Sequence, residues 1–316
     1  MSTAAAYSAD PIVTICLPVY RGAEWIARAI DSCLQQTYEQ FELLIVDNAS
    51  PDETASIARS FHDARVRLIV NSANIGMSPN HNRAIQFARG RFIKFLHADD
   101  VLKPNCLEEM LDVIQQDDRI GLVFSRREVL LADESDVNAR IWFEQFRDLH
   151  LKFDDLGEVN DGRALLDQWM QHGFGENWIG EPSAVLVRAH CFEELGGFNP
   201  QIRMLSDVDM WARIMSVYDV GFVDKELCSY LHHQQSATAH SVDSERHWLD
   251  RLWITESLLQ FEHNTRRYPE LRTMRRAELR HATRSLLGEP IALRRRSKEF
   301  LKYFAVRLRG HDAHRV

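Results

Sequence analysis

Short apolar segments that alternate with helical ones are the feature that most constrains the fold of this chain. The apolar, β-branched runs that predict buried strands lie at residues 12–19, 41–46, 66–70 and 92–96. The stretches between them predict helices over residues 23–36, 52–61 and 79–88. Since strand-helix-strand units of this kind form right-handed parallel pairs, we expect an α/β fold with a largely parallel, Rossmann-like sheet flanked by helices.

Polar residues follow the predicted strands. Asp47 ends the second strand, Asn74 and Gly76 lie in a turn-rich loop after the third, and Asp99 and Asp100 follow the fourth. Ligands of open α/β sheets collect at the carboxyl ends of strands, where adjacent aspartates supply oxygen ligands for Mg²⁺ or Mn²⁺ and, through the ion, hold a diphosphate. The alternative is that Asp99 and Asp100 only cap the next helix. No GxGxxG motif follows the first strand, which argues against a dinucleotide-binding site.

The composition is that of a soluble globular protein, with 45% hydrophobic and 27% charged residues among 316. No apolar run is long enough to span a membrane, and residues 1–10, which we expect to be disordered, do not resemble a signal peptide. The five cysteines are odd in number and far apart in the sequence. This pattern favours reduced thiols and a cytoplasmic protein.

The net charge of −8 conceals an acidic body and a basic tail. Residues 266–316 hold 15 Lys and Arg against 5 Asp and Glu, and apolar residues recur at helical spacing within residues 241–316. We therefore expect a basic helical C-terminal extension that packs on the body or mediates a homodimer. A peripheral contact with anionic membrane is the alternative. The acidic body argues against nucleic-acid binding.

The middle of the chain continues the α/β pattern less regularly. A helix is predicted over residues 101–115, strands over 120–124, 180–188 and 220–223, and a loop over 230–238. Residues 126–170 have no clean period. Their aromatic side chains form either a surface that stacks on sugars or a local hydrophobic cluster, and include Trp142, Phe143, Phe146, Phe153 and Trp169.

Four segments match a family pattern in order and spacing, namely LPVYRGAEWI, QQTYEQFELLIVDNAS, NSANIGMSPNHNRAI and FLHADD. With them, the chain resembles the family 2 glycosyltransferases, which have the GT-A fold and transfer sugars from nucleotide diphosphates with inversion. The resemblance covers residues 11–240. It implies a nucleotide-sugar-binding part over residues 11–125 and an acceptor-binding part over residues 126–240.

The resemblance places the donor nucleotide beside the first three strands. Pro18 and Tyr20 would line the base pocket, and Asn74 and Gly76 would lie along the ribose and base. Asp47 would accept a hydrogen bond from the base, which favours uracil or thymine. Judged from the residues alone, Pro18 and Tyr20 fit an ordinary strand end equally well, and Asp47 fits a helix cap.

The segment FLHADD resembles the metal-binding motif of the family. Asp99 matches the aspartate that coordinates Mn²⁺ or Mg²⁺ between the two phosphates. His97, Ala98 and Asp100 would belong to the nucleotide-sugar-binding residues, with Asp100 supporting Asp99 from behind. His97 stands where many relatives have the first aspartate, so it would instead donate a hydrogen bond or ligate the metal. His233 matches a histidine that reaches the diphosphate or the metal in some members.

The segment LSDVDMWAR at residues 205–213 resembles the one that carries the general base of the family. Asp207 is the matching residue, whereas Asp209 faces another side of the predicted helix and is expected to be structural. Ser206 and Leu231 stand where the family usually has Glu and Arg. In the alternative interpretation both carboxylates are charges at a helix N-terminus. The family counterpart of Glu181–Ser183 usually faces the reaction centre.

The resemblance implies a metal-assisted hexosyltransferase that uses a UDP- or dTDP-linked sugar. Its acceptor would be a saccharide or lipid-linked saccharide of bacterial cell-surface polysaccharide or lipopolysaccharide synthesis, reached from the cytoplasm or at the inner face of the membrane. Because His97, Ser206 and Leu231 depart from the pattern, a catalytically decayed sugar-nucleotide-binding or scaffold protein is one alternative. A sugar-nucleotide nucleotidyltransferase is another, although it needs a basic Gly-rich loop where only Arg21 and Gly22 occur.

Overall fold

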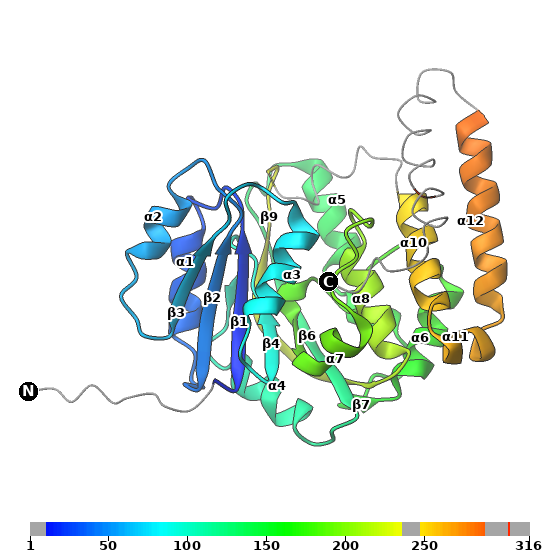
Figure 1. Ribbon diagram of the computed structural model, residues 1–316, viewed down its shortest axis with the longest axis horizontal. Coiled ribbons are helices and arrows are strands. Elements are labelled where there is room, and N and C mark those ends of the chain that lie inside the picture. The colour runs from blue at the N-terminus through cyan, green and yellow to red at the C-terminus, as the bar shows by residue number, and fades with distance from the viewer. Residues whose placement is uncertain (1–10, 236–246, 288–302, 304–316) are drawn as a thin grey trace, which may run out of the picture.

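A nine-stranded sheet forms the centre of the computed structural model, which describes residues 11–235, 247–287 and Tyr303 (Figure 1). Its strand order is β3-β2-β1-β4-β8-β6-β9-β5, and β7 pairs with β9. The first four strands are β1 (Val13–Val19), β2 (Phe41–Asp47), β3 (Val66–Val70) and β4 (Phe92–Phe95). They pair in parallel, as the alternation of strands and helices predicts.

The second half of the sheet is mixed. β8 (Val185–Arg188) is antiparallel to both of its neighbours, β4 and β6 (Ile120–Leu131). β9 (Asp219–His232) is parallel to β6 and pairs antiparallel with two short strands, β5 (Val101–Leu102) and β7 (Val159–Asn160). The predicted parallel order thus holds over β1 to β4 and gives way to mixed pairing beyond β4.

Several predicted boundaries are wrong. The strand predicted over 180–188 is β8 and begins at Val185, and the strand predicted over 120–124 is β6 and extends to Leu131. Residues Tyr230–His232, predicted as loop, form the end of β9 because they continue to pair with β6. Residues 101–102 form β5 instead of opening a helix, and α4 (Cys106–Ile114) begins later. Pro104 explains the delay, since a proline disfavours helical geometry at the preceding residue, and the N–H of Lys103 instead donates to a backbone carbonyl of β9 at 2.9 Å.

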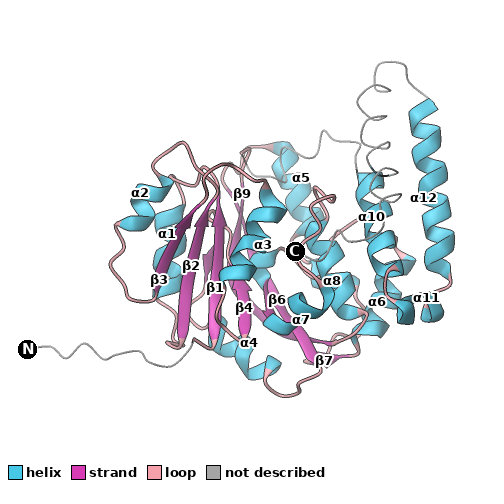
Figure 2. Cartoon of the chain, in the orientation of Figure 1, coloured by secondary structure: helices cyan, strands magenta, loops and turns pink. Residues whose placement is uncertain are grey.

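Helices cover both faces of the sheet, each face over its own hydrophobic cluster (Figure 2). One face carries α4 together with α1 (Ile26–Leu34) and α2 (Thr54–Arg59). The other face carries α3 (Met77–Phe87), α6 (Gly162–Gln171), α7 (Ala189–Leu195) and α8 (Ser206–Met215). Because both faces are covered, the ends of the strands are left to bind ligands.

The C-terminal helices pack against the body. Leu252 and Ile254 of α10 (His247–Leu259) join the same buried cluster as Trp211 of α8. α11 (Glu262–Arg267) and α12 (Glu270–Leu287) lie at the end of the molecule opposite to β3 (Figure 1). The predictions for residues 1–10 and 236–246, and for 288–316 other than Tyr303, fall outside the described residues. Within 11–235 and 247–287, no helix is long and apolar enough to cross a membrane.

Candidate active site

The strand directions bring the predicted site residues to one edge of the sheet. β1, β2, β4, β6 and β9 run the same way, so Asp47, Asp99 and His233 lie at or just beyond strand ends on this edge. β8 runs the other way, so the short helical turn that precedes it, Pro182–Ala184, starts at the same edge. Side chains far apart in the sequence therefore become neighbours.

Asparagine side chains tie together the loops after β2 and β3. Asn48 donates to Oδ1 of Asn74 at 2.9 Å and to the carbonyl of Gly76 at 3.2 Å, and Gly76 has a φ of +94°. Asp47 is buried, and its carboxylate accepts from the N–H of Ser50 at 3.3 Å and from the Ser50 hydroxyl. Asp47 therefore caps the turn at Ser50 and not the helix α2. Its contact with a nucleotide base stays a prediction.

Pro18 and Tyr20, at the end of β1, differ in accessibility. Pro18 is buried within the strand, whereas 43% of Tyr20 is exposed beside the sheet edge. The guanidinium of Arg21 lies 5.4 Å from the centroid of the Tyr20 ring. Of the two predicted base contacts, Tyr20 is the one whose side chain a ligand can reach.

Asp99 and His233 meet at this edge. Nε2 of His233 lies 3.0 Å from Oδ2 of Asp99, and the ring of Trp25 packs 5.0 Å from the His233 ring. Burial opposes ionisation of Asp99, but the hydrogen bond from His233 and the proximity of His97 outweigh it and lower the pKa of Asp99. Asp99 is therefore a carboxylate that faces an imidazole, a pair suited to a divalent metal ion.

These two side chains fit an ion that shares its other ligands with a substrate. Mg²⁺ sites in phosphate-handling enzymes typically use one or two protein carboxylates together with phosphate oxygens and water. The described residues contain no group of three or more His, Cys, Asp or Glu that would enclose an ion without a substrate. Asp99 and His233 would hold the ion from the protein side.

His97 does not join this pair, because its ring lies between His81 and Asp100. Nδ1 of His81 lies 3.0 Å from the carbonyl of Met77, which can only accept, so this nitrogen carries the proton. Burial lowers the pKa of His81 to about 3, and its neutral Nε2 therefore accepts from Nε2 of His97 at 3.3 Å. The hydrogen bond predicted for His97 is thus directed within the protein, and its contact with the donor stays a prediction.

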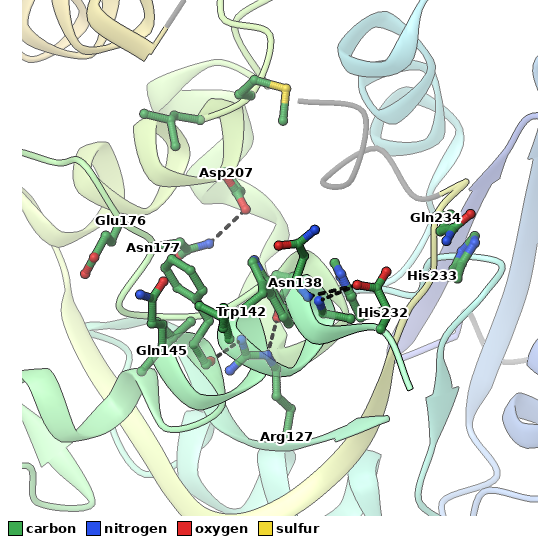
Figure 3. Close-up of a pocket in the computed structure, with 18 of the residues that line it drawn as sticks. Arg127, Asn138, Trp142, Gln145, Glu176, Asn177, Asp207, His232, His233 and Gln234 are labelled. Atoms are coloured by element: carbon green, nitrogen blue, oxygen red, sulfur yellow. Dashed lines mark hydrogen bonds and ion pairs between the residues drawn. The ribbon is translucent and has the colours of Figure 1, made fainter. Parts of the chain in front are cut away.

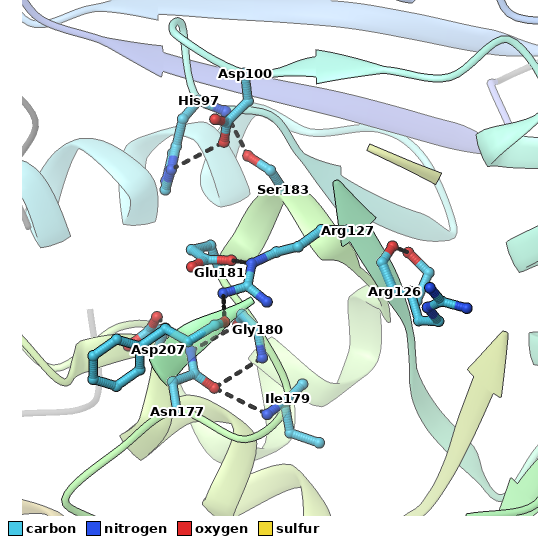
Figure 4. A network of polar contacts seen from close by, with 12 residues as sticks. His97, Asp100, Arg126, Arg127, Asn177, Ile179, Gly180, Glu181, Ser183 and Asp207 are labelled. Carbon is cyan, nitrogen blue, oxygen red and sulfur yellow. Dashed lines mark hydrogen bonds and ion pairs between the residues drawn. The ribbon is translucent and has the colours of Figure 1, made fainter. Parts of the chain in front are cut away.

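Asp100 and Ser183 brace the turn that follows β4 (Figure 4). Asp100 accepts from the N–H of Leu231 at 3.2 Å, and the hydroxyl of Ser183 accepts from the N–H of His97 at 3.0 Å. Burial, and after it the carboxylate of the preceding residue, raise the pKa of Asp100 well above its usual value. Asp100 supports the turn from behind, and Ala98 is partly buried in the same turn.

Asp207 lies in the first turn of α8 and is held by two hydrogen bonds (Figure 4). The side chain of Asn177 donates to Oδ2 at 2.8 Å, and the N–H of Val208 donates to Oδ1 at 2.8 Å. Burial, reinforced by the charge of Glu181, raises the pKa of Asp207 to about 7. A carboxyl group with this pKa can take up a proton from a hydroxyl substrate near neutral pH.

A cavity of 1290 Å³ connects these groups (Figure 3). His233 and Asp207 both line it, and Arg127 and Glu181 form an ion pair of 2.5 Å in its wall. The cavity therefore joins the predicted base to one predicted metal ligand. The other predicted site residues lie along the sheet edge and are not part of the cavity lining, namely Pro18, Tyr20, Asp47, Asn74, Gly76, His97, Ala98, Asp99 and Asp100.

Comparison with known sequences decides the family. The sequence profile of Glycosyl transferase family 2 matches residues 14–169. An uncharacterized protein of Mycobacterium tuberculosis is 35% identical over 251 residues, which cover 79% of this chain and 76% of that protein. The chain is a family 2 glycosyltransferase. The resemblance inferred from its motifs is thereby confirmed.

One named relative and one solved structure agree with this family. The UDP-Glc:alpha-D-GlcNAc-diphosphoundecaprenol beta-1,3-glucosyltransferase WfgD of Escherichia coli is 34% identical over 121 residues, which cover 38% of this chain and 47% of that protein. The crystal structure of S. aureus TarS 1-349 in complex with UDP-GlcNAc matches with a TM-score of 0.65 and 14% identity, covering 90% of this chain and 78% of that one. The predicted GT-A fold is therefore confirmed.

Sequence reasoning missed three residues that shape the site of this glycosyltransferase, namely Asn177, Arg127 and His81. Arg127 lies beyond the predicted end of its strand. His81 reaches His97 because α3 packs on β1 and β2 and places the His81 ring 5.5 Å from that of Phe95 in β4. A signal did exist for Asn177, since an Asn shortly before a Gly is typical of a turn. Its Oδ1 accepts from the N–H of the second and third residues after it, at 3.1 and 2.9 Å.

Asp250 of α10 fixes the chain just before α8. Its carboxylate is buried and accepts from the backbone N–H of Arg203, Met204 and Leu205 at 3.2, 2.8 and 3.3 Å. We expect Asp250→Ala to lower the free energy of unfolding by about 1 to 3 kcal/mol, because buried N–H groups lose their acceptor. We also expect kcat to fall more than the donor KM changes, because Asp207 follows only two residues after this anchor.

Urea unfolding and steady-state kinetics measure both effects of the Asp250 substitution. Asp250→Asn keeps one acceptor oxygen and should fall between the original protein and Asp250→Ala in both measurements. If Asp250→Ala retained the full kcat, the C-terminal extension would have no part in positioning Asp207.

Proposed function

We propose that this glycosyltransferase moves a hexose from a UDP- or dTDP-linked donor to a hydroxyl group of a saccharide acceptor, with inversion at the anomeric carbon. The observation that carries the proposal is that Asp207, whose pKa is raised to about 7, lines the same cavity as His233, the partner of Asp99. A proton acceptor, Asp207, and a residue that would bind the leaving diphosphate, His233, thus line one cavity. This arrangement suits a direct displacement. The donors named for WfgD and TarS favour UDP over dTDP.

Asp207 acts in this proposal as the general base. The acceptor hydroxyl gives its proton to the Asp207 carboxylate while its oxygen attacks the anomeric carbon on the side opposite to the diphosphate. The bond from the anomeric carbon to the diphosphate oxygen breaks in the same step, and its electron pair leaves with the nucleotide diphosphate. The donors from Asn177 and Val208 orient the carboxylate, and each of its oxygens keeps a lone pair for the proton.

The donor would lie along the sheet edge, with its diphosphate at Asp99 and His233. These residues would hold Mn²⁺ or Mg²⁺, which when bound neutralises the charge that builds on the departing diphosphate. Tyr20, Asp47 and Asn74 would contact the base and ribose. This placement leaves the hexose beside the cavity that Asp207 lines.

We place the acceptor in cell-surface polysaccharide synthesis. The acceptor in the name of WfgD is a sugar on diphosphoundecaprenol, a lipid carrier. The five cysteines of this chain are free and buried, which is consistent with a reducing compartment. The basic C-terminal extension would approach the anionic membrane surface where a lipid-linked acceptor resides.

The departures from the family pattern do not favour a decayed enzyme. His97 donates a hydrogen bond to His81, and Leu231 contributes to the site through its backbone N–H, which an arginine would supply equally well. Asp99 and Asp207 remain in positions suited to their roles. A nucleotidyltransferase would need several basic groups after β1 to hold a triphosphate, and Arg21 supplies one.

Donor binding tests the proposal. We expect UDP and a UDP-hexose to raise the thermal midpoint of the purified protein in the presence of Mn²⁺, since a ligand that binds the folded state stabilises it. The increase should disappear in Asp99→Ala because the diphosphate loses its anchor. Asp224→Ala serves as the matched control, since the Asp224 side chain is 74% exposed and forms an ion pair with Arg126, its one such partner within the described residues.

The outcome separates the remaining possibilities. A shift by dTDP and not UDP would change the assignment of the base and leave the transferase proposal standing. Absence of a shift with every nucleotide diphosphate would reject the proposed donor site.

A further inference from the structure

One helix of the acceptor-binding part contributes a mixed polar and aromatic wall to the cavity. α5 (Val137–Phe146) is N-capped by Asp136, whose side chain accepts from the N–H of Asn138 at 2.9 Å. Asn138, Trp142 and Gln145 are four and three residues apart, so they share one face of the helix. All three line the cavity, and Figure 3 shows Trp142 and Gln145 across from Asp207.

The ring of Trp142 is held in a fixed orientation. It stacks on His232, with 4.3 Å between ring centroids and 7° between ring planes. Phe146 and Tyr230 hold it from further directions, at centroid distances of 5.3 and 5.6 Å. The indole nevertheless remains partly exposed and lines the cavity. A braced, partly exposed aromatic ring offers contact area at little cost in conformational entropy.

The polar groups around this ring select against anions. Carboxylates outnumber the guanidinium groups of Arg127 and Arg251 among the lining residues, so a phosphate or a uronic acid would be repelled. The carboxamides of Asn138 and Gln145 have no hydrogen-bond partner in the described part of the chain, and each offers both donors and an acceptor. Uncharged hydroxyl groups match such amides best.

We infer that this face of α5 is the acceptor subsite and that it binds an uncharged saccharide, one ring of which packs on the indole of Trp142. The amides of Asn138 and Gln145 bind hydroxyl groups of that saccharide, and the hydroxyl that reacts points across the cavity to Asp207. The inference rests on the proposed function and names the substrate class of its second site. It also assigns the aromatic residues of 126–170 that face the cavity to sugar stacking.

Fluorine NMR tests the inference on the full chain. Labelling with 5-fluorotryptophan gives one signal for each of the 7 tryptophans, and Trp142→Phe identifies the signal of Trp142 by its loss. The probes are neutral methyl glycosides of glucose and N-acetylglucosamine and the disaccharide maltose, compared with glucuronate and inorganic phosphate. We expect the neutral probes, and not the anions, to shift the Trp142 signal.

Trp25 supplies an internal control for the donor site, because its ring packs against His233. UDP with Mn²⁺ should shift the Trp25 signal. If Trp25 responds to UDP while Trp142 responds to no neutral saccharide, the acceptor inference is overturned and the proposed function stands. If neither signal responds, both are overturned.

Calorimetry of the variants adds a quantitative test. Trp142→Ala should weaken saccharide binding about tenfold, the effect of losing one stacked aromatic contact, and Trp142→Phe should weaken it less. Phe143→Ala is the matched control, since Phe143 lies on the same helix and does not line the cavity. Equal losses in Trp142→Ala and Phe143→Ala would show that only the stability of α5 matters and would overturn the inference.

Discussion

Replacement of Asp207 by Asn is expected to lower kcat by about 10²- to 10⁴-fold, the contribution typical of a general base. The amide has nearly the size of the carboxylate and can still accept the hydrogen bond from Asn177. It cannot take up a proton at neutral pH, so the acceptor hydroxyl would have to react unassisted. Release of nucleotide diphosphate during sugar transfer measures kcat, and the thermal shift with UDP and Mn²⁺ checks that donor binding survives.

A second carboxylate of the same cavity provides the control for Asp207. Asp133 lines the cavity, and its carboxylate accepts from the N–H and the hydroxyl of Ser135 at 2.9 and 2.6 Å. Asp133→Asn should leave kcat nearly unchanged, because this carboxylate serves a surface turn. A loss of the same size in both variants, or full activity in Asp207→Asn, would rule out Asp207 as the base.

The pH dependence follows from the raised pKa of Asp207. Only the ionised carboxylate can accept a proton, so kcat should fall about tenfold for each pH unit below about 7 and level off above it. Part of the rise in pKa comes from the charge of Glu181. Glu181→Gln removes that charge and should move the break in the profile to lower pH. A profile that breaks in the opposite direction would indicate an acid in place of a base.

The positions of the residues proposed to bind the donor could be predicted from the sequence because they depend on local patterns. Each apolar run in the first hundred residues is followed by polar residues. Parallel pairing of the four strands then brings their carboxyl ends to the same edge of the sheet, so the sequence alone is enough to place these polar residues together. The likeness of FLHADD and of the segment around His233 to family motifs added Asp99 and His233 as predicted metal ligands, and the structure places these two side chains 3.0 Å apart.

The proposed acceptor side could not be predicted in the same way, because its contacts depend on tertiary packing. Trp142 belongs to a helix with no clean apolar period, and its stacking partner His232 lies in the last three residues of β9, which the sequence predicts as loop. Asn177 touches Asp207 across 30 residues of sequence, and no local pattern encodes that contact. Asp250 holds the backbone just before α8, but it lies in a segment that the composition indicates only as a separate C-terminal extension.

Loss of the buried ion pair in α8 should have the largest effect on stability. Asp209 and Arg213 are 0% and 1% exposed and lie 2.8 Å apart, which agrees with the structural role expected for Asp209. Arg213 also donates to the carbonyls of Leu195, Gly196 and Gly197 at 2.6, 3.2 and 2.7 Å. Arg213→Met would leave a buried carboxylate unpaired and should lower the free energy of unfolding by about 3 to 5 kcal/mol.

Two further variants separate the causes of that loss. Adding Asp209→Leu to Arg213→Met should restore part of the stability in urea unfolding, because the unpaired buried charge is removed. Arg119→Met breaks an ion pair with Asp219 in which the arginine is 76% exposed, and should cost no more than about 1 kcal/mol. If Arg213→Met cost no more than Arg119→Met, Asp209 would not need its partner to remain buried.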